Sequence, residues 1–255
     1  MKKKFQGTGF LLLLGFFSAM FYSCQKDEDN DAQTVMTITA SNIVNSPNSI
    51  AIVKCQSYNP VTHGYDYTVA ETPFANGGFT LTLPETVPSI YLKDFWDGEE
   101  IPTGISVSDT TAKTLECTPY TYNTNDKETG YFYYANADYS LEDSDFESEA
   151  LWMYVDKNTK IKGKHTYTED ADLNVDEYNL NLKKGWNLIY TTENVTYNSA
   201  TQAKTYTFKC TNAKPSYTFN WYYYKYYTSY SYTKSAQLKE ETAHALRLFS
   251  KRHNR

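Results

Sequence analysis

Short runs of alternating apolar and polar residues dominate this sequence, and turn signals interrupt them about every ten residues. The clearest run, FTLTLPE (79–85), places Phe79, Leu81 and Leu83 on one face and threonines on the other. This period of two is that of a half-buried strand, and the ANGG stretch before it (75–78) suits a turn because Asn and Gly tolerate positive φ angles. The pattern constrains the chain strongly toward an antiparallel β fold.

Similar runs fill the rest of the chain, and no helical segment separates them. In the first half they are VMTITA (35–40), SIAIVKC (49–55), residues 65–71 and SIYLKDF (89–95). In the second half they are YFYYANADYS, ALWMYVD (150–156), KTYTFKC and two strands around the turn Lys183-Lys184-Gly185. The 25 tyrosines fit this interpretation, because aromatic side chains pack well on a pleated surface.

We therefore predict an all-β fold of antiparallel β-sandwich modules, two in number and Ig-like or transthyretin-like in style. The division is placed near residue 110, giving modules over 34–110 and 111–234, with one continuous sandwich as the alternative. In the tail, 235–255, apolar residues such as Leu238, Ala245 and Phe249 recur at helical spacing. This spacing predicts a short C-terminal helix over about 236–251.

The N-terminus has the pattern of a secretory signal. Lysines at positions 2–4 precede the apolar stretch FLLLLGFFSAMF (10–21), which would measure roughly 18 Å as a helix. A hydrocarbon core about 30 Å thick is too wide for it to cross. A charged start, a short apolar core and a small residue, Ser23, at its end predict a signal peptide over residues 1–23.

Cys24 follows this signal directly, and the acidic run Asp27-Glu28-Asp29 comes just behind it. The segment resembles the signal of bacterial lipoproteins, in particular the surface-exposed lipoproteins of Bacteroidetes, although Phe21 and Tyr22 stand where that signal has Leu and a small residue. The resemblance implies that Cys24 is lipidated, that residues 24–33 form an acidic tether, and that the protein is held in the outer membrane and displayed at the cell surface. The alternative is a soluble secreted protein in which Cys24 is incidental.

Charge and cysteine usage limit the partners. Without residues 1–23 the chain has 24 − 3 = 21 basic and 30 acidic side chains, a formal charge of −9, which argues against a nucleic-acid partner. Three cysteines remain after the anchor, and one disulfide is allowed in an exported chain. The sequence leaves open which two of Cys55, Cys117 and Cys210 pair.

No catalytic or cofactor motif stands out. The body contains only His63 and His165, each interpreted as solvated, and it lacks a G-x-S-x-G elbow, an H-E-x-x-H pair and a phosphate-binding glycine run. Two acidic clusters, 142–149 and 169–177, are interpreted as solvated loops. We expect no cofactor and no enzymatic activity, with a carboxylate-based glycoside hydrolase as the less favoured alternative.

The second acidic cluster also offers a weak candidate for calcium, because oxygen-bearing side chains alternate there as they do in calcium loops. Val175 stands where an EF-hand-type loop needs Gly, and Asn181 stands where it needs a bidentate Glu. The candidate ligands are Asp170, Asp172, Asn174 and Asp176.

Aromatic residues give the best indication of function. The stretch 216–233 is rich in tyrosine, and because strand side chains alternate, part of this row must face solvent or a partner. Tyr and Trp rings suit sugar rings and protein surfaces alike, whereas the alternative is a set of cross-strand aromatic pairs. The candidate ligand-binding residues are Trp221, Tyr223, Tyr224 and Tyr226.

Together these features predict a non-catalytic lipoprotein that attaches to the membrane through Cys24 and acts as a binding or adhesion module for a surface protein or a glycan. The alternatives are a carbohydrate-binding accessory lipoprotein of a glycan-uptake system and a structural subunit of a larger assembly.

Overall fold

The computed structural model describes residues 35–59, 61–62, 64–96, 98–138, 146–169, 171–200 and 203–225. The predicted all-β class is confirmed, because the described residues form strands with one short 3₁₀-helix, η1 (Ser89–Tyr91), and no α-helix. The first strands are β1 (Thr37–Ala40), β2 (Ile52–Asn59), β3 (Gly64–Pro73), β4 (Phe79–Thr82), β5 (Lys93–Asp94), β6 (Ile105–Val107) and β7 (Lys113–Tyr122). The later strands are β8 (Glu128–Ala135), β9 (Phe146–Val155), β10 (Thr159–Glu169), β11 (Asp172–Leu182), β12 (Gly185–Tyr197), β13 (Lys204–Thr211) and β14 (Asn220–Lys225).

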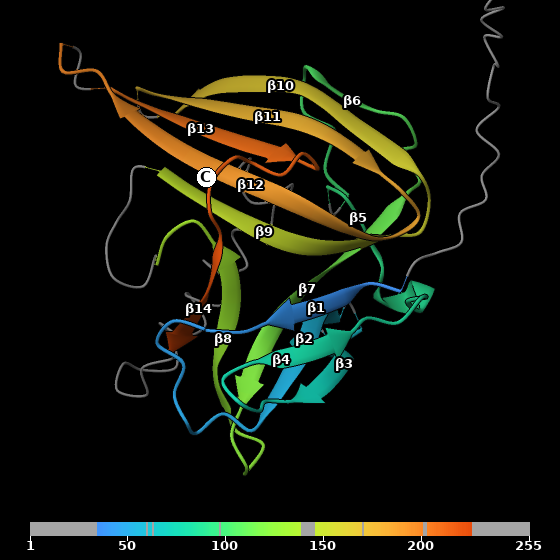
Figure 1. Ribbon diagram of the computed structural model, residues 1–255. Coiled ribbons are helices and arrows are strands. Elements are labelled where there is room, and N and C mark those ends of the chain that lie inside the picture. The colour runs from blue at the N-terminus through green and yellow to red at the C-terminus, as the bar shows by residue number, and fades with distance from the viewer. Residues whose placement is uncertain are drawn as a thin grey trace, which may run out of the picture. The chain divides into compact units, whose positions relative to one another are not determined.

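Strand β7 is the branch point of the large sheet (Figure 1). Along one edge its N-terminal half pairs with β9, as in Leu115 with Tyr154, and its C-terminal half pairs with β8, as in Tyr120 with Tyr131. The other edge of β7 pairs with β5 and β2. The sheet therefore divides into two arms. The first arm contains β3, β2, the C-terminal half of β7, β8 and β14, and the second arm contains the N-terminal half of β7, β9, β12, β13, β11, β10 and β6.

The small sheet of β1 and β4 contributes to the same core as the first arm. Alternation places Ile38 on β1 and Phe79 and Leu81 on β4 in this core, as the sequence pattern predicts. Phe79 stacks on Phe132 of β8 with ring centroids 5.5 Å apart, and it meets Trp221 of β14 edge-on. Large apolar side chains buried in this way contribute about 1.5–3 kcal/mol each.

Strand β9 is buried on both faces and joins the two cores. Its side chains Trp152 and Tyr154 belong to the core of the first arm. The alternate residues Leu151, Met153 and Val155 belong to a second core, on what we call the inner face of the second arm. A short connection from β5 to β6 brings Phe95 and Trp96 into this second core, and β6 then pairs with β10.

The predicted turn at 75–78 is present, with positive φ at both Asn76 and Gly77 and reciprocal hydrogen bonds of 3.0 Å between Ala75 and Gly78. A disulfide joins Cys55 of β2 to Cys117 of β7, and Cys210 is a buried free thiol. The disulfide thus links strands on the two sides of the residue-110 boundary, and the described residues group into one compact unit.

Several details differ from the sequence-based expectations. Residues 89–95 begin with η1 rather than with a strand. The turn after Leu182 does not make a hairpin, because β13 lies between β11 and β12 and pairs in parallel with β11. The expected C-terminal helix lies outside the described residues, and within them no helix is long and apolar enough to cross a membrane.

Candidate functional site

The predicted aromatic row does not form one exposed surface. Trp221 and Tyr223 are only 7% and 5% exposed and lie in the core between β14 and the small sheet. Tyr224 is half-buried and lies on the opposite face of β14, and Tyr226 lies outside the described residues. The alternation of a paired strand explains the split, so Trp221 and Tyr223 present no ring face to a ligand.

Cross-strand pairing accounts for the other tyrosines of β14. Tyr222 stacks on Tyr133 and Tyr224 stacks on Tyr131, with ring centroids 5.4 Å and 5.1 Å apart. Such pairs stabilise two neighbouring strands by a few tenths of a kcal/mol to about 1 kcal/mol each. The alternative that the sequence left open, aromatic pairs that stiffen a β-surface, describes these residues.

The calcium candidate is not a loop. Asp172, Asn174 and Asp176 lie along β11, where alternate Cα atoms are about 6.6 Å apart, so their oxygens cannot converge on one ion as they would in a turn. Asp172 instead accepts a hydrogen bond of 2.7 Å from the backbone N–H of Lys204, and Asp176 is buried at 1% exposure. Asp170 lies outside the described residues, and no group of three His, Cys, Asp or Glu among the described residues could hold a metal ion.

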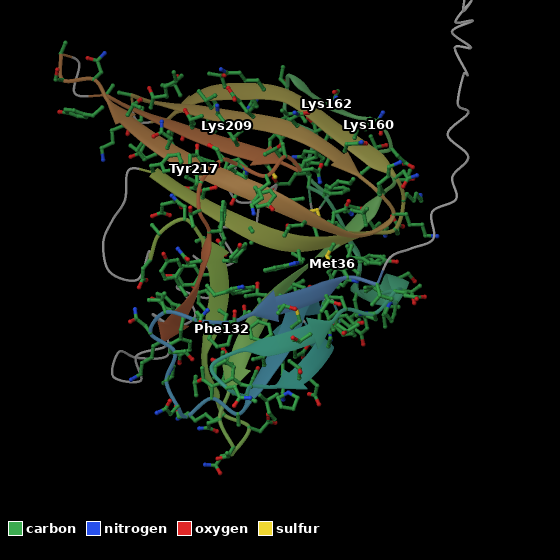
Figure 2. The ribbon with its side chains drawn as sticks, viewed as in Figure 1. Met36, Phe132, Lys160, Lys162, Lys209 and Tyr217 are labelled. Carbon is green, nitrogen blue, oxygen red and sulfur yellow. A yellow bond between two sulfur atoms is a disulfide. The ribbon has the colours of Figure 1, made fainter. Side chains whose placement is uncertain are left out.

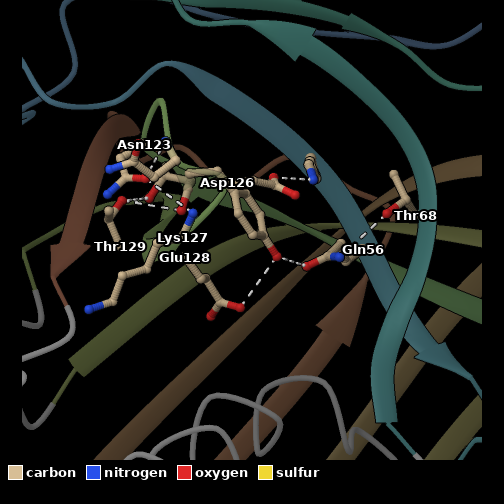
Figure 3. Close-up of polar contacts among 11 residues, drawn as sticks. Gln56, Thr68, Asn123, Asp126, Lys127, Glu128 and Thr129 are labelled. Atoms are coloured by element: carbon tan, nitrogen blue, oxygen red, sulfur yellow. Dashed lines mark hydrogen bonds and ion pairs between the residues drawn. The ribbon is translucent and has the colours of Figure 1, made fainter.

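A polar network at the β7–β8 turn is structural (Figure 3). The Tyr122 hydroxyl donates to Gln56 Oε1 at 2.6 Å and lies 3.3 Å from a carboxylate oxygen of Glu128, and burial raises the pKa of this hydroxyl. Asn123 accepts hydrogen bonds from two backbone N–H groups of the turn, and Lys54 pairs with Asp126 at 2.6 Å. These contacts link β2 to the β7–β8 hairpin.

The inner face of the second arm carries a more unusual set of side chains, at the end where β9 begins. The sequence places a loop at 142–149, but β9 already begins at Phe146, so Glu147 and Glu149 are strand residues on the inner face. Glu147 lies directly opposite Glu193 of β12, and Glu149 lies opposite Thr191. Cα atoms of such opposite residues are about 4.5–5.5 Å apart, so three carboxyl groups gather on two strands.

The same rows continue across the sheet. The row of Glu147 and Glu193 continues through Phe208 and Asp176 to His165. One step toward the end of the arm lies a row of four half-buried residues, which pair across β12, β13, β11 and β10. These are Val195, Tyr206, Asn174 and Tyr167.

Exposure rises along this face from its interior toward its end. Thr191, Cys210 and Tyr178, in the row of Glu149, are buried. Glu149 itself keeps part of its surface exposed. We refer to Glu147, Glu149, Glu193, Tyr206, Asn174 and Tyr167 as the inner-face site.

The electrostatics of the site favour a protonated carboxyl at Glu149. Burial, together with the nearby carboxylates of Glu147 and Glu193, raises the pKa of Glu149 to about 8. Burial also raises the pKa of Glu116 on β7 to about 8, with Lys93 opposing the shift, and burial beside Glu116 raises the pKa of the Cys210 thiol. Near neutral pH, Glu149 is therefore mostly a neutral carboxyl that can both donate and accept a hydrogen bond.

Glu116 and Glu149 lie apart on the sheet. Glu116 lies opposite Met153, four residues along β9 from Glu149, which corresponds to about 13 Å of backbone at about 3.3 Å per residue. His165 is positioned by a 2.9 Å contact between Nδ1 and the carbonyl of Thr103 and by stacking on Tyr167, and His63 lies outside the described residues.

Comparison with known proteins gives no further guide: no family model, no curated protein and no solved structure matches this chain.

Proposed function

We propose that this chain is a lipid-anchored, non-enzymatic binding protein of the bacterial outer membrane that holds a neutral glycan at the inner-face site. One observation carries the proposal. On the inner face, Tyr206 and Tyr167 flank Asn174 in a single cross-strand row. Glu147 and Glu193 lie in the next row toward the interior of this face, and Glu149 lies in the row after that.

This combination suits a sugar. Tyrosine rings present an apolar face to the C–H groups of a sugar ring, and their hydroxyls bond to its polar edge. The amide of Asn174 and the carboxyl of Glu149 each donate and accept hydrogen bonds, as alternating sugar hydroxyls require. The half-buried state of Tyr206, Asn174 and Tyr167 leaves part of each side chain accessible to a ligand.

A protein partner is the second candidate from the sequence, and the geometry favours it less. Protein interfaces are centred on exposed aromatic or arginine anchors. The exposed large apolar side chains of the described residues, such as Val61, Ile90, Tyr197 and Tyr217, come from separate elements.

The N-terminal sequence supports the same proposal, because a lipid anchor at Cys24 would hold the inner-face site at the membrane surface. Several acyl chains, at about 0.8 kcal/mol per buried methylene, anchor a protein far better than one chain does.

A glycan array with the full-length protein in detergent tests the proposal. We expect binding to neutral oligosaccharides that falls when Tyr206 is changed to Ala and persists when the exposed Tyr217 is changed to Ala. A blank array with folded protein would reject the glycan and turn attention to protein partners.

A further inference from the structure

The outer face of β10, β11 and β13 carries a set of lysines that the inner-face site does not use. Lys160, Lys162 and Lys164 alternate along β10 and are all exposed, and Lys209 of β13 is exposed on the same face. Figure 2 labels Lys160, Lys162 and Lys209 on these strands. Because alternate strand residues share a face, the three lysines of β10 form a line with steps of about 6.6 Å.

The strand register shows which residues lie opposite these lysines on the neighbouring strands. Lys160 is opposite Asn181, and Lys162 is opposite Asn179, both on β11 and both exposed. Thr211 of β13 and Ser106 of β6 complete the row of Lys162. The rows of Lys160 and Lys162 therefore offer ammonium, amide and hydroxyl groups, and they contain no carboxylate among the described residues.

Among the described residues of β6, β10, β11 and β13, one acid lies on this face. Glu177 of β11 is opposite both Lys164 and Lys209, and its carboxylate contacts the Nζ atoms of both lysines at 3.3 Å. These two ion pairs lower the pKa of the Glu177 carboxyl against the opposing effect of burial. Four lysines against one glutamate leave a local charge of +3, in a chain whose formal net charge is −6.

Local charge decides what such a face attracts. At physiological ionic strength charges are screened beyond about 8 Å, so a ligand lying along β10 interacts with the lysines more than with acids elsewhere on the protein. The set of lysines and amides, which we call the lysine face, is therefore complementary to a chain of anionic groups that also carries hydroxyls.

The chemistry of the face distinguishes among polyanions. A site that inserts between lipid headgroups uses large apolar side chains, and a single-strand nucleic-acid site uses aromatic rings on which bases stack. The residues opposite Lys160, Lys162 and Lys164 are Asn181, Asn179 and Glu177, none of which is apolar or aromatic.

We propose that the lysine face is a docking surface for an acidic polysaccharide, in which Lys160 and Lys162 pair with carboxylate or sulfate groups and Asn179 and Asn181 bond to hydroxyls. This proposal does not depend on the inner-face site, because the lysines and the inner-face residues project from opposite sides of the same strands.

The test uses the full-length protein in detergent with polygalacturonate as the anionic probe and dextran as the neutral one, measured by biolayer interferometry. A Lys160→Gln/Lys162→Gln variant is compared with Lys113→Gln/Lys127→Gln, which removes the same charge from exposed lysines on β7 and the β7–β8 turn. We expect polygalacturonate binding that weakens as salt rises, falls about tenfold in the first variant and stays near wild type in the second.

Three results would overturn the proposal. The first is equal loss of affinity in the two variants, which would show a non-specific effect of net charge. The second is dextran bound as tightly as polygalacturonate. The third is tighter binding, through the same two lysines, to anionic lipid vesicles or to a DNA oligonucleotide. Thermal melting of each variant confirms that it is folded, which surface Lys→Gln changes are expected to preserve.

Discussion

Trp152 of β9 and Trp221 of β14 stack face to face, with ring centroids 5.5 Å apart and planes 5° from parallel. The pair joins the strand shared by both cores to the last described strand of the first arm. It assigns a structural role to Trp221, which the sequence suggested as a ligand-binding residue.

Changing Trp221 to Ala should therefore destabilise the protein. We expect a loss of about 3–5 kcal/mol in the free energy of unfolding, because a large buried ring is replaced by a cavity. Urea denaturation followed by circular dichroism measures the change, with Tyr217→Ala, 42% exposed, as the control. A Trp221→Ala protein as stable as wild type would contradict the packing described here.

The strands themselves were largely predictable, because their signal is local. Phe79 and Leu81 alternate with threonines, and Asn76 and Gly77 adopt the positive φ angles that their residue types favour. The parallel pairing of β11 with β13 was not predictable, since no local pattern shows that residues 204–211 insert between two strands that are adjacent in sequence.

The inner-face site was missed for a related reason. The polar stretch ending at Glu149 suggests a loop, and only the alternation Glu147, Glu149, Leu151, Met153 indicates that the strand starts earlier and turns these glutamates inward. The same alternation separates Trp221 and Tyr223 from Tyr224, so that a run of aromatics in the sequence is not one surface.

The raised pKa of Glu149 predicts how stability varies with pH. Its pKa is about 8 in the folded protein, against an ordinary value of 4.5, so between these values the folded state binds more protons than the unfolded state. The free energy of unfolding must then fall as pH rises through this window, by up to about 1.4 kcal/mol per pH unit, and level off above it.

A Glu149→Gln variant cannot ionise and should lose this contribution. Relative to wild type, we expect its stability to improve steadily from pH 5 to pH 8, as measured by urea midpoints across that range. The exposed Glu71→Gln variant serves as a control and should follow the wild-type curve. Parallel curves for Glu149→Gln and wild type would show that this carboxyl titrates normally.

The disulfide joins Cys55 to Cys117, which are 62 positions apart in the sequence. Loop-closure entropy for that length corresponds to about 4 kcal/mol. We expect a Cys55→Ala/Cys117→Ala variant to be less stable by about 2–4 kcal/mol, as determined by chemical denaturation. A Cys210→Ala variant keeps the disulfide and should lose less, so equal losses in the two variants would argue against this pairing.

The proposed lipidation of Cys24 predicts the behaviour of the protein in detergent. Expressed in a Bacteroidetes host, the protein should partition into the detergent phase of Triton X-114, and Cys24→Ala should move it to the aqueous phase. Mass spectrometry of the N-terminal peptide would show acyl groups on Cys24. An unmodified N-terminus beginning elsewhere would leave the secreted alternative.

A glycan array that compares wild type, Tyr206→Ala and Tyr217→Ala decides whether the inner face binds a glycan. We expect wild type and Tyr217→Ala to bind the same neutral oligosaccharides, and we expect Tyr206→Ala to lose this binding while remaining folded. Undiminished binding by Tyr206→Ala, or no binding by folded wild type to any glycan, would contradict the proposed glycan binding.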